Sequence, residues 1–138
     1  MIINIVNKKK IIRLVKESIK ESKKEVLATM LLQEEIENPL PSSYHALLQK
    51  RAKKGVKIKR LGFGSKVDYN LVKNKLSMPA RNYQFRYVPS ISTYQRLLII
   101  DRKILFFGID GVFFQSSYKP LVKVFVDYFT KVFKKGKS

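Results

Sequence analysis

The segment from residue 94 to residue 109, YQRLLIIDRKILFFGI, places two apolar runs of strand length on either side of the polar triplet Asp101-Arg102-Lys103. Short apolar runs bounded by turn residues are typical of buried β-strands, and aspartate readily opens a turn. The segment therefore predicts two strands joined by a tight turn. This requirement restricts the chain to folds that contain a β-sheet.

Strand and helix patterns alternate along the rest of the chain. Period-two alternation, as in residues 82–88, indicates a strand, and apolar residues that recur every three or four positions, as in residues 10–22, indicate a helix. These patterns predict further strands at residues 2–6, 25–31, 56–63 and 82–88, and helices at residues 10–22, 44–54 and 66–76 and from Pro120 towards the basic segment KKGKS.

Turn residues predict where the elements end. The acidic segment 34–43, EEIENPLPSS, holds two prolines and is predicted to be a loop. Ser42 or Ser43 is predicted to cap the helix at 44–54, which Gly55 ends, and MPAR, residues 78–81, is predicted to end the helix at 66–76. The element order predicts a single α/β domain over residues 1–138, with a mixed, partly parallel sheet flanked by helices.

The charge of the chain indicates the kind of partner. The 29 Lys and Arg residues against 10 Asp and Glu residues give a formal net charge of +19, while a hydrophobic content of 45% is ample for a packed core. A polyanion is the expected partner: nucleic acid first, and an anionic membrane surface as the weaker alternative. A lysine-rich proteome could also produce such a surface without a polyanionic partner.

The composition excludes several kinds of disulfide, metal and thiol site. The chain has no cysteine and one histidine, His45, so disulfides, thiolate sites and multi-histidine metal clusters are excluded, and no metal or cofactor is expected. No segment approaches the ~18 apolar residues that span a bilayer. A cytoplasmic protein without a transmembrane segment is expected.

One spacing in the hairpin carries a family resemblance. Tyr94, Arg96 and Asp101 follow the pattern of the HxKxxxxD motif of the phospholipase D superfamily, with LLII between the second and third positions and Gly108 after the next strand. Upstream, RAKKGVKIKRL resembles the helix, glycine and strand of that family. Nearly the whole chain is similar to one repeat of the fold.

The resemblance implies a site and an assembly. In that family the motif histidine attacks phosphorus, the lysine holds phosphate oxygens, and chains with one motif form homodimers with facing motifs. The implied site residues here are Tyr94, Arg96 and Asp101. However, tyrosine replaces the histidine, and the family's GSxN element reads GIDG, with Ile109 and Gly111 in place of serine and asparagine. Loss of catalysis is therefore expected.

Three hypotheses for function follow. The first is a non-catalytic phospholipase-D-like domain that binds nucleic acid through phosphate. The second is an active phosphodiesterase or nuclease with Tyr94 as the nucleophile. The third is a dimerisation or ligand-sensor module, similar to the degenerate domain of TrmB-type regulators, although no winged-helix reader like theirs is expected before residue 10.

The basic run at residues 50–60 is the strongest candidate for the polyanion contact, since it spans a helix end and a strand. Residues predicted to contact nucleic acid, with Arg96 at the centre of a phosphate site, are Lys50, Arg51, Lys53, Lys54, Lys57, Lys59, Arg60, Arg86, Arg102 and Lys103. Each motif residue also has a purely structural interpretation. Asp101 could serve simply as a turn former, Tyr94 as an ordinary cross-strand aromatic residue, and Arg96 as a residue at the rim that extends its charged end to solvent.

Two aromatic patterns have alternative interpretations. Tyr83, Phe85 and Tyr87 fit a half-buried sheet face better than a base-stacking platform. The phenylalanines of the closing helix, Phe125, Phe129 and Phe133, fit a core stripe better than an interfacial membrane anchor.

Overall fold

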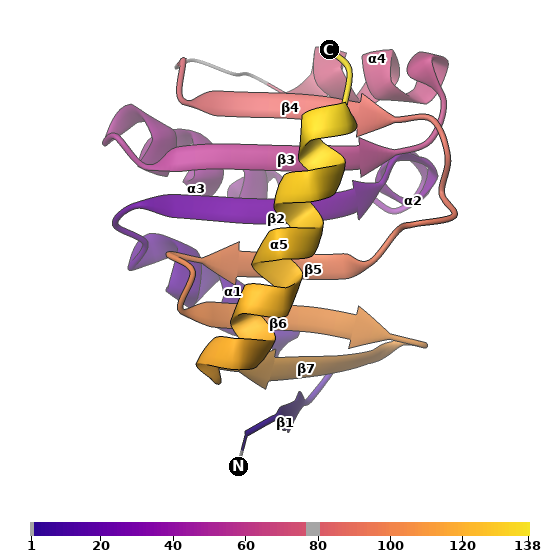
Figure 1. Ribbon diagram of the computed structural model, residues 1–138. Coiled ribbons are helices and arrows are strands. Elements are labelled where there is room, and N and C mark those ends of the chain that lie inside the picture. The colour runs from indigo at the N-terminus through magenta and orange to yellow at the C-terminus, as the bar shows by residue number, and fades with distance from the viewer. Residues whose placement is uncertain (1, 77–80) are drawn as a thin grey trace.

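The computed structural model describes residues 2–76 and 81–138 and contains one mixed sheet of seven strands in the order β1-β7-β6-β5-β2-β3-β4 (Figure 1). The elements in chain order are β1 (Asn4–Val6), α1 (Ile11–Lys20), β2 (Glu25–Leu31), α2 (Leu32–Glu37), α3 (Ser42–Lys53), β3 (Lys57–Phe63), α4 (Lys66–Lys75), β4 (Tyr83–Val88), β5 (Arg96–Ile100), β6 (Ile104–Ile109), β7 (Val112–Ser116) and α5 (Lys119–Lys135).

The sheet combines a parallel half and an antiparallel half. Strands β2, β3 and β4 are parallel, whereas β5, β6, β7 and β1 continue the sheet from β2 with antiparallel pairing. The predicted α/β class with a mixed sheet is confirmed. The helices alternate with the parallel strands because parallel neighbours need a crossover connection, whereas the β5–β6 and β6–β7 pairs need only short turns.

Helices cover both faces of the sheet. The long helix α5 crosses one face, and α1 and α3 lie on the other (Figure 1). The core is divided accordingly. Ile19 and Leu48 bury the inner sides of α1 and α3, while Phe129 and Phe133 pack α5 against Leu61 on the opposite face. The phenylalanines of the closing helix are thus core residues, and those of them at 129 and 133 are at most 6% exposed.

Two tight turns order the antiparallel half. Asp101 and Arg102, with φ of 54° and 56°, connect β5 to β6, and Asp110 and Gly111, with φ of 50° and 76°, connect β6 to β7. Left-handed residues in pairs are the geometry that matches the twist of a β-hairpin. The first turn was predicted, whereas the sequence interpretation missed β7, for which the Asp110-Gly111 pair was a usable signal.

The segment between β2 and α3 differs from the prediction. Residues 32–37 form helix α2, so the predicted loop at 34–43 is wrong in its first part. Leu32 is fully buried, and it anchors the helix beside the sheet. Helix α3 begins at Ser42 after Pro41, without a side-chain cap, so neither serine has the predicted capping role. Most of the predicted break at MPAR lies outside the described residues.

The C-terminal segment returns to the edge of the sheet. Lys137 and Tyr87 exchange two backbone hydrogen bonds, both 2.8 Å long, as an antiparallel bridge on the outer side of β4. Gly136 allows this approach, because a Cβ there would lie 2.9 Å from the Cβ of Arg86. Within the described part of the chain, no helix is long and apolar enough to cross a membrane.

Candidate functional site

Tyr94, at the nucleophile position of the motif, is a packing residue in this structure. It precedes β5, and its ring packs in the cluster below α5, edge-on to Phe63 at 5.2 Å between ring centres. Its hydroxyl is buried and has no hydrogen-bond partner among the described residues. Burial is the main reason why the pKa of Tyr94 rises to about 12, against the opposing effect of Arg96. The phenol is therefore neutral at pH 7.

Arg96, at the lysine position, is held by an internal carboxylate. It begins β5 and donates two hydrogen bonds, of 2.7 and 2.5 Å, to the carboxylate of Glu34 in α2. These bonds raise the pKa of the Arg96 guanidinium, against the effect of partial burial. Gly108 makes room for the side chain, because a Cβ there would lie 2.8 Å from Cδ of Arg96. The predicted phosphate ligand is thus already engaged by an anion.

The two residues border a small depression at the edge where β5 and β7 begin. It has a volume of about 330 Å³, and its lining residues are Tyr94, Gln95, Arg96, Gly108, Ile109, Asp110, Gly111 and Phe113. Tyr94 precedes the strand and packs below α5, whereas Arg96 turns towards Glu34 in α2. The two side chains still meet at this end of β5, because the Arg96 guanidinium lies 5.8 Å from the centre of the Tyr94 ring. Arg96 is the one cation in this lining and faces Glu34, so this motif pocket has no excess of positive charge.

Asp101 lies at the other end of β5. The strand has five residues, and at ~3.4 Å per residue it separates Arg96 from Asp101 by roughly 17 Å. The Asp101 carboxylate accepts backbone hydrogen bonds from Lys23 at 2.9 Å, Lys24 at 2.7 Å and Glu25 at 2.9 Å. Partial burial disfavours its charge, but these bonds hold the pKa of Asp101 below its usual value. The three motif residues therefore do not form one site.

A larger and strongly basic depression lies around Asp101. It has a volume of about 1150 Å³ and is formed where β2 and β3 begin, at the β5–β6 turn and at the start of α5. We call it the basic groove, and its lining residues are Lys23, Lys24, Glu25, Gly55, Lys57, Asp101, Arg102, Lys103, Ile104, Ser117, Lys119 and Lys123. Its two carboxylates are used internally, since Glu25 accepts from Arg102 at 2.6 Å and Asp101 accepts from the backbone.

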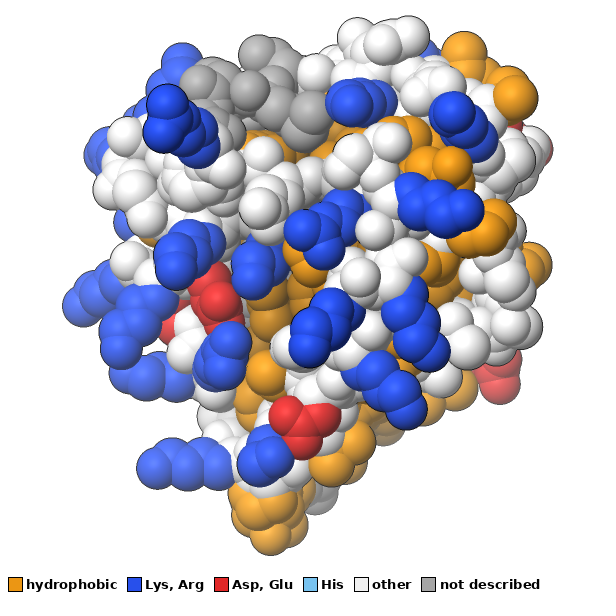
Figure 2. Space-filling model, turned by 45° about the horizontal axis from the view of Figure 1, so that its top comes forward, with side chains coloured by type: hydrophobic (Ala, Val, Ile, Leu, Met, Phe, Trp, Pro, Cys, Tyr) orange, Lys and Arg blue, Asp and Glu red, His pale blue; other side chains and the backbone are white. Residues whose placement is uncertain are grey.

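The basic groove continues along the inner side of α5. Arg102 also borders a second depression, of about 380 Å³, whose other lining residues are Leu27, Lys59, Gln84, Arg86, Phe129, Thr130, Phe133 and Lys134. Arg86 is fixed there, because it donates to the Phe133 carbonyl at 3.0 Å and its guanidinium lies 4.3 Å from the centre of the Phe133 ring. Figure 2 shows Lys and Arg side chains crowded over the apolar surface of this side of the molecule.

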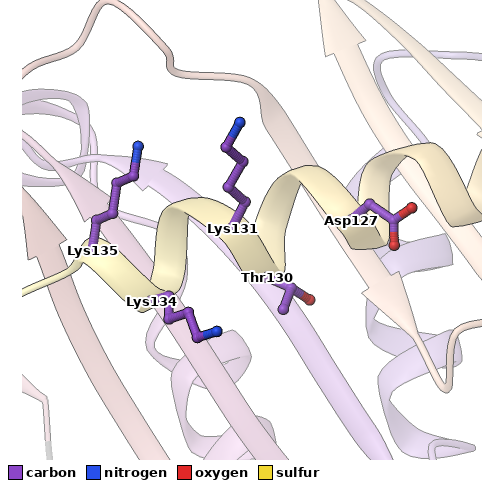
Figure 3. Close-up of a pocket in the computed structure, with 5 residues that line it drawn as sticks. All are labelled: Asp127, Thr130, Lys131, Lys134 and Lys135. Atoms are coloured by element: carbon purple, nitrogen blue, oxygen red, sulfur yellow. The ribbon is translucent and has the colours of Figure 1, made fainter.

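Helix α5 adds cations on two of its sides. Lys131 and Lys135 project to the same side of the helix, and Lys134 projects to another (Figure 3). Together with Asp127 and Thr130 they border a shallow depression of about 500 Å³. Asp127 is engaged by Lys123, at 2.8 Å, so the lysines of the last two turns dominate the charge of this part of the helix.

Apart from Arg60, the predicted contact residues lie in two regions, the basic groove with its continuation and the end of α3. Lys57, Lys59, Arg86, Arg102 and Lys103 border the basic groove or its continuation. Near the end of α3, Lys50, Lys53 and Lys54 are exposed, while Arg51 donates to the Ser22 carbonyl. The sequence interpretation missed Lys23, Lys24, Lys119, Lys123 and Lys134, which come from distant segments and are brought together by the fold.

Arg60 was predicted on the surface and is instead in the core. It is 1% exposed, and its Nη1 lies 3.1 Å from the Tyr83 hydroxyl and 3.0 Å from Nδ1 of His45. His45 Nε2 in turn lies 3.5 Å from the Glu35 carboxylate. Arg60 follows Ile58 on the face that α1 and α3 cover, so it cannot reach a polymer at the surface. Within residues 2–76 and 81–138, no group of three His, Cys, Asp or Glu side chains could hold a metal ion.

Comparison with solved structures identifies the fold. TrmBL2, an archaeal chromatin protein whose structure shows a novel mode of DNA binding, aligns with a TM-score of 0.75 and 17% identity over 99% of this chain. The chain spans only about half of TrmBL2, 54% of its length. Nuc from Salmonella typhimurium, a phospholipase D family member, aligns with a TM-score of 0.66 and 12% identity, and NucT from Helicobacter pylori with 0.64 and 13%.

These two alignments cover nearly whole molecules. They include 98% of this chain and 94% of Nuc, and 97% of this chain and 95% of NucT. No family model and no curated protein sequence matches the chain. The structural likeness shows that the protein has a phospholipase D-like fold, as the motif spacing and element order indicated.

Proposed function

We propose that this protein binds the phosphate backbone of nucleic acid, without cleaving it, through the basic groove and its continuation along α5. The observation that carries the proposal is the gathering of seven lysine and arginine residues in one groove that has two carboxylates, of which Asp101 is bound by backbone N–H groups and Glu25 by Arg102. The fold shared with an archaeal DNA-binding chromatin protein supports it. Lys50, Lys53 and Lys54 extend the proposed surface around Gly55, and a cytoplasmic location is consistent with such a role.

The motif pocket lies outside this interface. Arg96 is engaged by Glu34, at the opposite end of β5 from the basic groove. The alternative hypothesis, a phosphodiesterase with Tyr94 as nucleophile, needs a phenolate that can reach phosphorus. The Tyr94 hydroxyl is instead buried and neutral at pH 7. The geometry therefore favours binding without turnover.

The proposal is tested by the salt dependence of binding. Each phosphate contact contributes about −0.9 to the slope of log K against log salt concentration. One contact therefore makes the affinity about eightfold higher at 0.1 M salt than at 1 M salt. We expect the double substitution Lys57→Ala/Lys103→Ala to weaken binding of a labelled 20-mer duplex by about 60-fold at 0.1 M salt, and to reduce the slope by about 1.8.

The matched control removes two charges elsewhere. Lys66 and Lys75 are exposed residues of α4, outside the basic groove. Lys66→Ala/Lys75→Ala should leave the slope within about 0.3 of the wild-type value. Equal losses in both variants would show a diffuse charge effect and would reject the groove as the site. Binding that does not change with salt would reject phosphate contacts altogether.

We also propose that the chain forms a homodimer through the surface around the motif pocket, which lies at the opposite end of β5 from the basic groove. Ile91, Ile109 and Val112 are 63%, 53% and 42% exposed, and Ile109 and Val112 are paired at the β6–β7 turn beside the motif pocket. A second copy would cover these apolar side chains. Sedimentation should give a dimer for the wild type and a monomer for Ile109→Lys; a monomeric wild type at micromolar concentration would exclude this assembly.

A further inference from the structure

We infer that Asp101 is a positioning residue of the nucleic-acid surface: its carboxylate ties the segment that carries Lys23 and Lys24 to the turn that carries Arg102 and Lys103. This inference rests on the proposed function. It assigns to the aspartate of the motif a role in binding, at the end of the sheet opposite to Tyr94 and Arg96.

The first part of the arrangement is the segment between α1 and β2. One Asp101 oxygen accepts from the backbone N–H groups of Lys24 and Glu25, at 2.7 and 2.9 Å, and the other accepts from Lys23 at 2.9 Å. Three successive N–H groups that converge on one carboxylate fix the backbone of these residues, because charge-assisted bonds are stronger than neutral ones. The lysine side chains that leave this backbone border the basic groove.

The second part is the turn itself. Asp101 and Arg102 both have left-handed backbones, which the β5–β6 hairpin requires, and the Asp101 N–H donates to the Glu25 carbonyl at 2.9 Å. The Glu25 carboxylate accepts from Nε of Arg102 at 2.6 Å. Two basic segments that are about 77 residues apart in the chain are therefore joined through Asp101 and Glu25.

The direction in which Asp101→Asn changes the binding affinity distinguishes a positioning role from a simple effect of charge. Asp101→Asn removes one negative charge beside the proposed interface, so electrostatics alone predicts tighter binding of a polyanion. An asparagine tolerates the left-handed backbone, and its oxygen can still accept from Lys24 and Glu25. Its amide group, however, would face the Lys23 N–H as a second donor. The positioning role therefore predicts weaker binding.

The experiment compares Asp101→Asn with Asp110→Asn on the same duplex. Asp110 occupies the equivalent left-handed position of the other hairpin turn, carries the same charge, and lies away from the basic groove. If one phosphate contact is lost, we expect Asp101→Asn to bind about eightfold more weakly at 0.1 M salt and with a slope smaller by about 0.9. Asp110→Asn should bind as tightly as the wild type or more tightly.

A double-mutant cycle separates positioning from a general loss of structure. In a background of Lys23→Ala and Lys24→Ala, the substitution Asp101→Asn should cause no further loss of affinity or slope. A persistent loss in that background would refute the inference, as would Asp101→Asn binding equal to or tighter than wild type. Failure of the wild type to bind in a salt-dependent way would instead refute the proposed function, so the two failures are distinguishable.

Discussion

The hydroxyl group of Tyr94 provides a sharp test of whether the motif pocket retained a chemical role. In the structure this hydroxyl is buried and has no hydrogen-bond partner among the described residues. The hydroxyl of the neighbouring Thr29 already donates to the Gln95 carbonyl at 2.5 Å and accepts from the Leu97 N–H at 3.0 Å. Tyr94→Phe removes only the oxygen atom and keeps the ring packed against Phe63.

The expected magnitude follows from the state of this oxygen. An unsatisfied buried polar group destabilises a protein by about 1–3 kcal/mol, because its bonds to water are lost without replacement. Taking the low end for a side chain at the edge of the core, Tyr94→Phe should raise the free energy of unfolding by about 1 kcal/mol. For 138 residues this corresponds to an increase in Tm of about 3 °C.

Tyr128→Phe is the matched control. The hydroxyl of Tyr128 donates to the Thr93 carbonyl at 2.5 Å, so its removal should destabilise the protein by about 1 kcal/mol. Urea unfolding followed by circular dichroism at pH 7 measures both variants. A loss of stability in Tyr94→Phe would refute the reasoning, since it would show that the hydroxyl is hydrogen-bonded. Cleavage of nucleic acid by the wild type that this substitution abolishes would overturn the non-catalytic proposal.

Three further outcomes are expected. Partial burial opposes ionisation of Asp101, but the backbone N–H groups hold its pKa below the usual value. The stabilisation by the charged carboxylate is therefore present above about pH 4 and disappears as the pH falls through the lower folded-state pKa. Urea midpoints should fall more for wild type than for Asp101→Asn between pH 5 and pH 2. Glu34→Gln removes the half-exposed pair with Arg96 and should lower stability by at most about 1 kcal/mol in the same assay. Gly62→Ala would place a Cβ 2.5 Å from Cδ2 of Leu32 and should destabilise by about 1–3 kcal/mol, with partial rescue by Leu32→Val; an additive double mutant would contradict this contact.

The sheet was predictable because its strands carry local signals. Alternation at 82–88 and the apolar runs around Asp101 identify strands that the structure confirms. Helix α2 was missed because its acidic residues and the following prolines resemble a loop. The apolar pair Leu32 and Ile36, four positions apart, was the available helical signal, and both side chains pack in the same cluster.

The candidate site was less predictable, because proximity along the chain is not proximity in space. A motif that spans a whole strand places residues at opposite ends of that strand, as for Arg96 and Asp101 at the two ends of β5. Arg60 was counted with its basic neighbours, although strand alternation places it on the same face as Ile58. The lysines at 23, 24, 119 and 123 meet only through the tertiary fold, and no local pattern relates them.

The bridge between Lys137 and Tyr87 also has a consequence for how copies of the molecule behave when they are crowded. Strand β4 is an edge strand, and unpaired edges are templates for association between sheets. The C-terminal segment forms hydrogen bonds with both the backbone N–H and the backbone carbonyl of Tyr87, and it brings Lys137 to that edge. Molecules concentrated side by side along one polymer would then be kept from joining their sheets, and removing residues 136–138 should make the protein prone to aggregate.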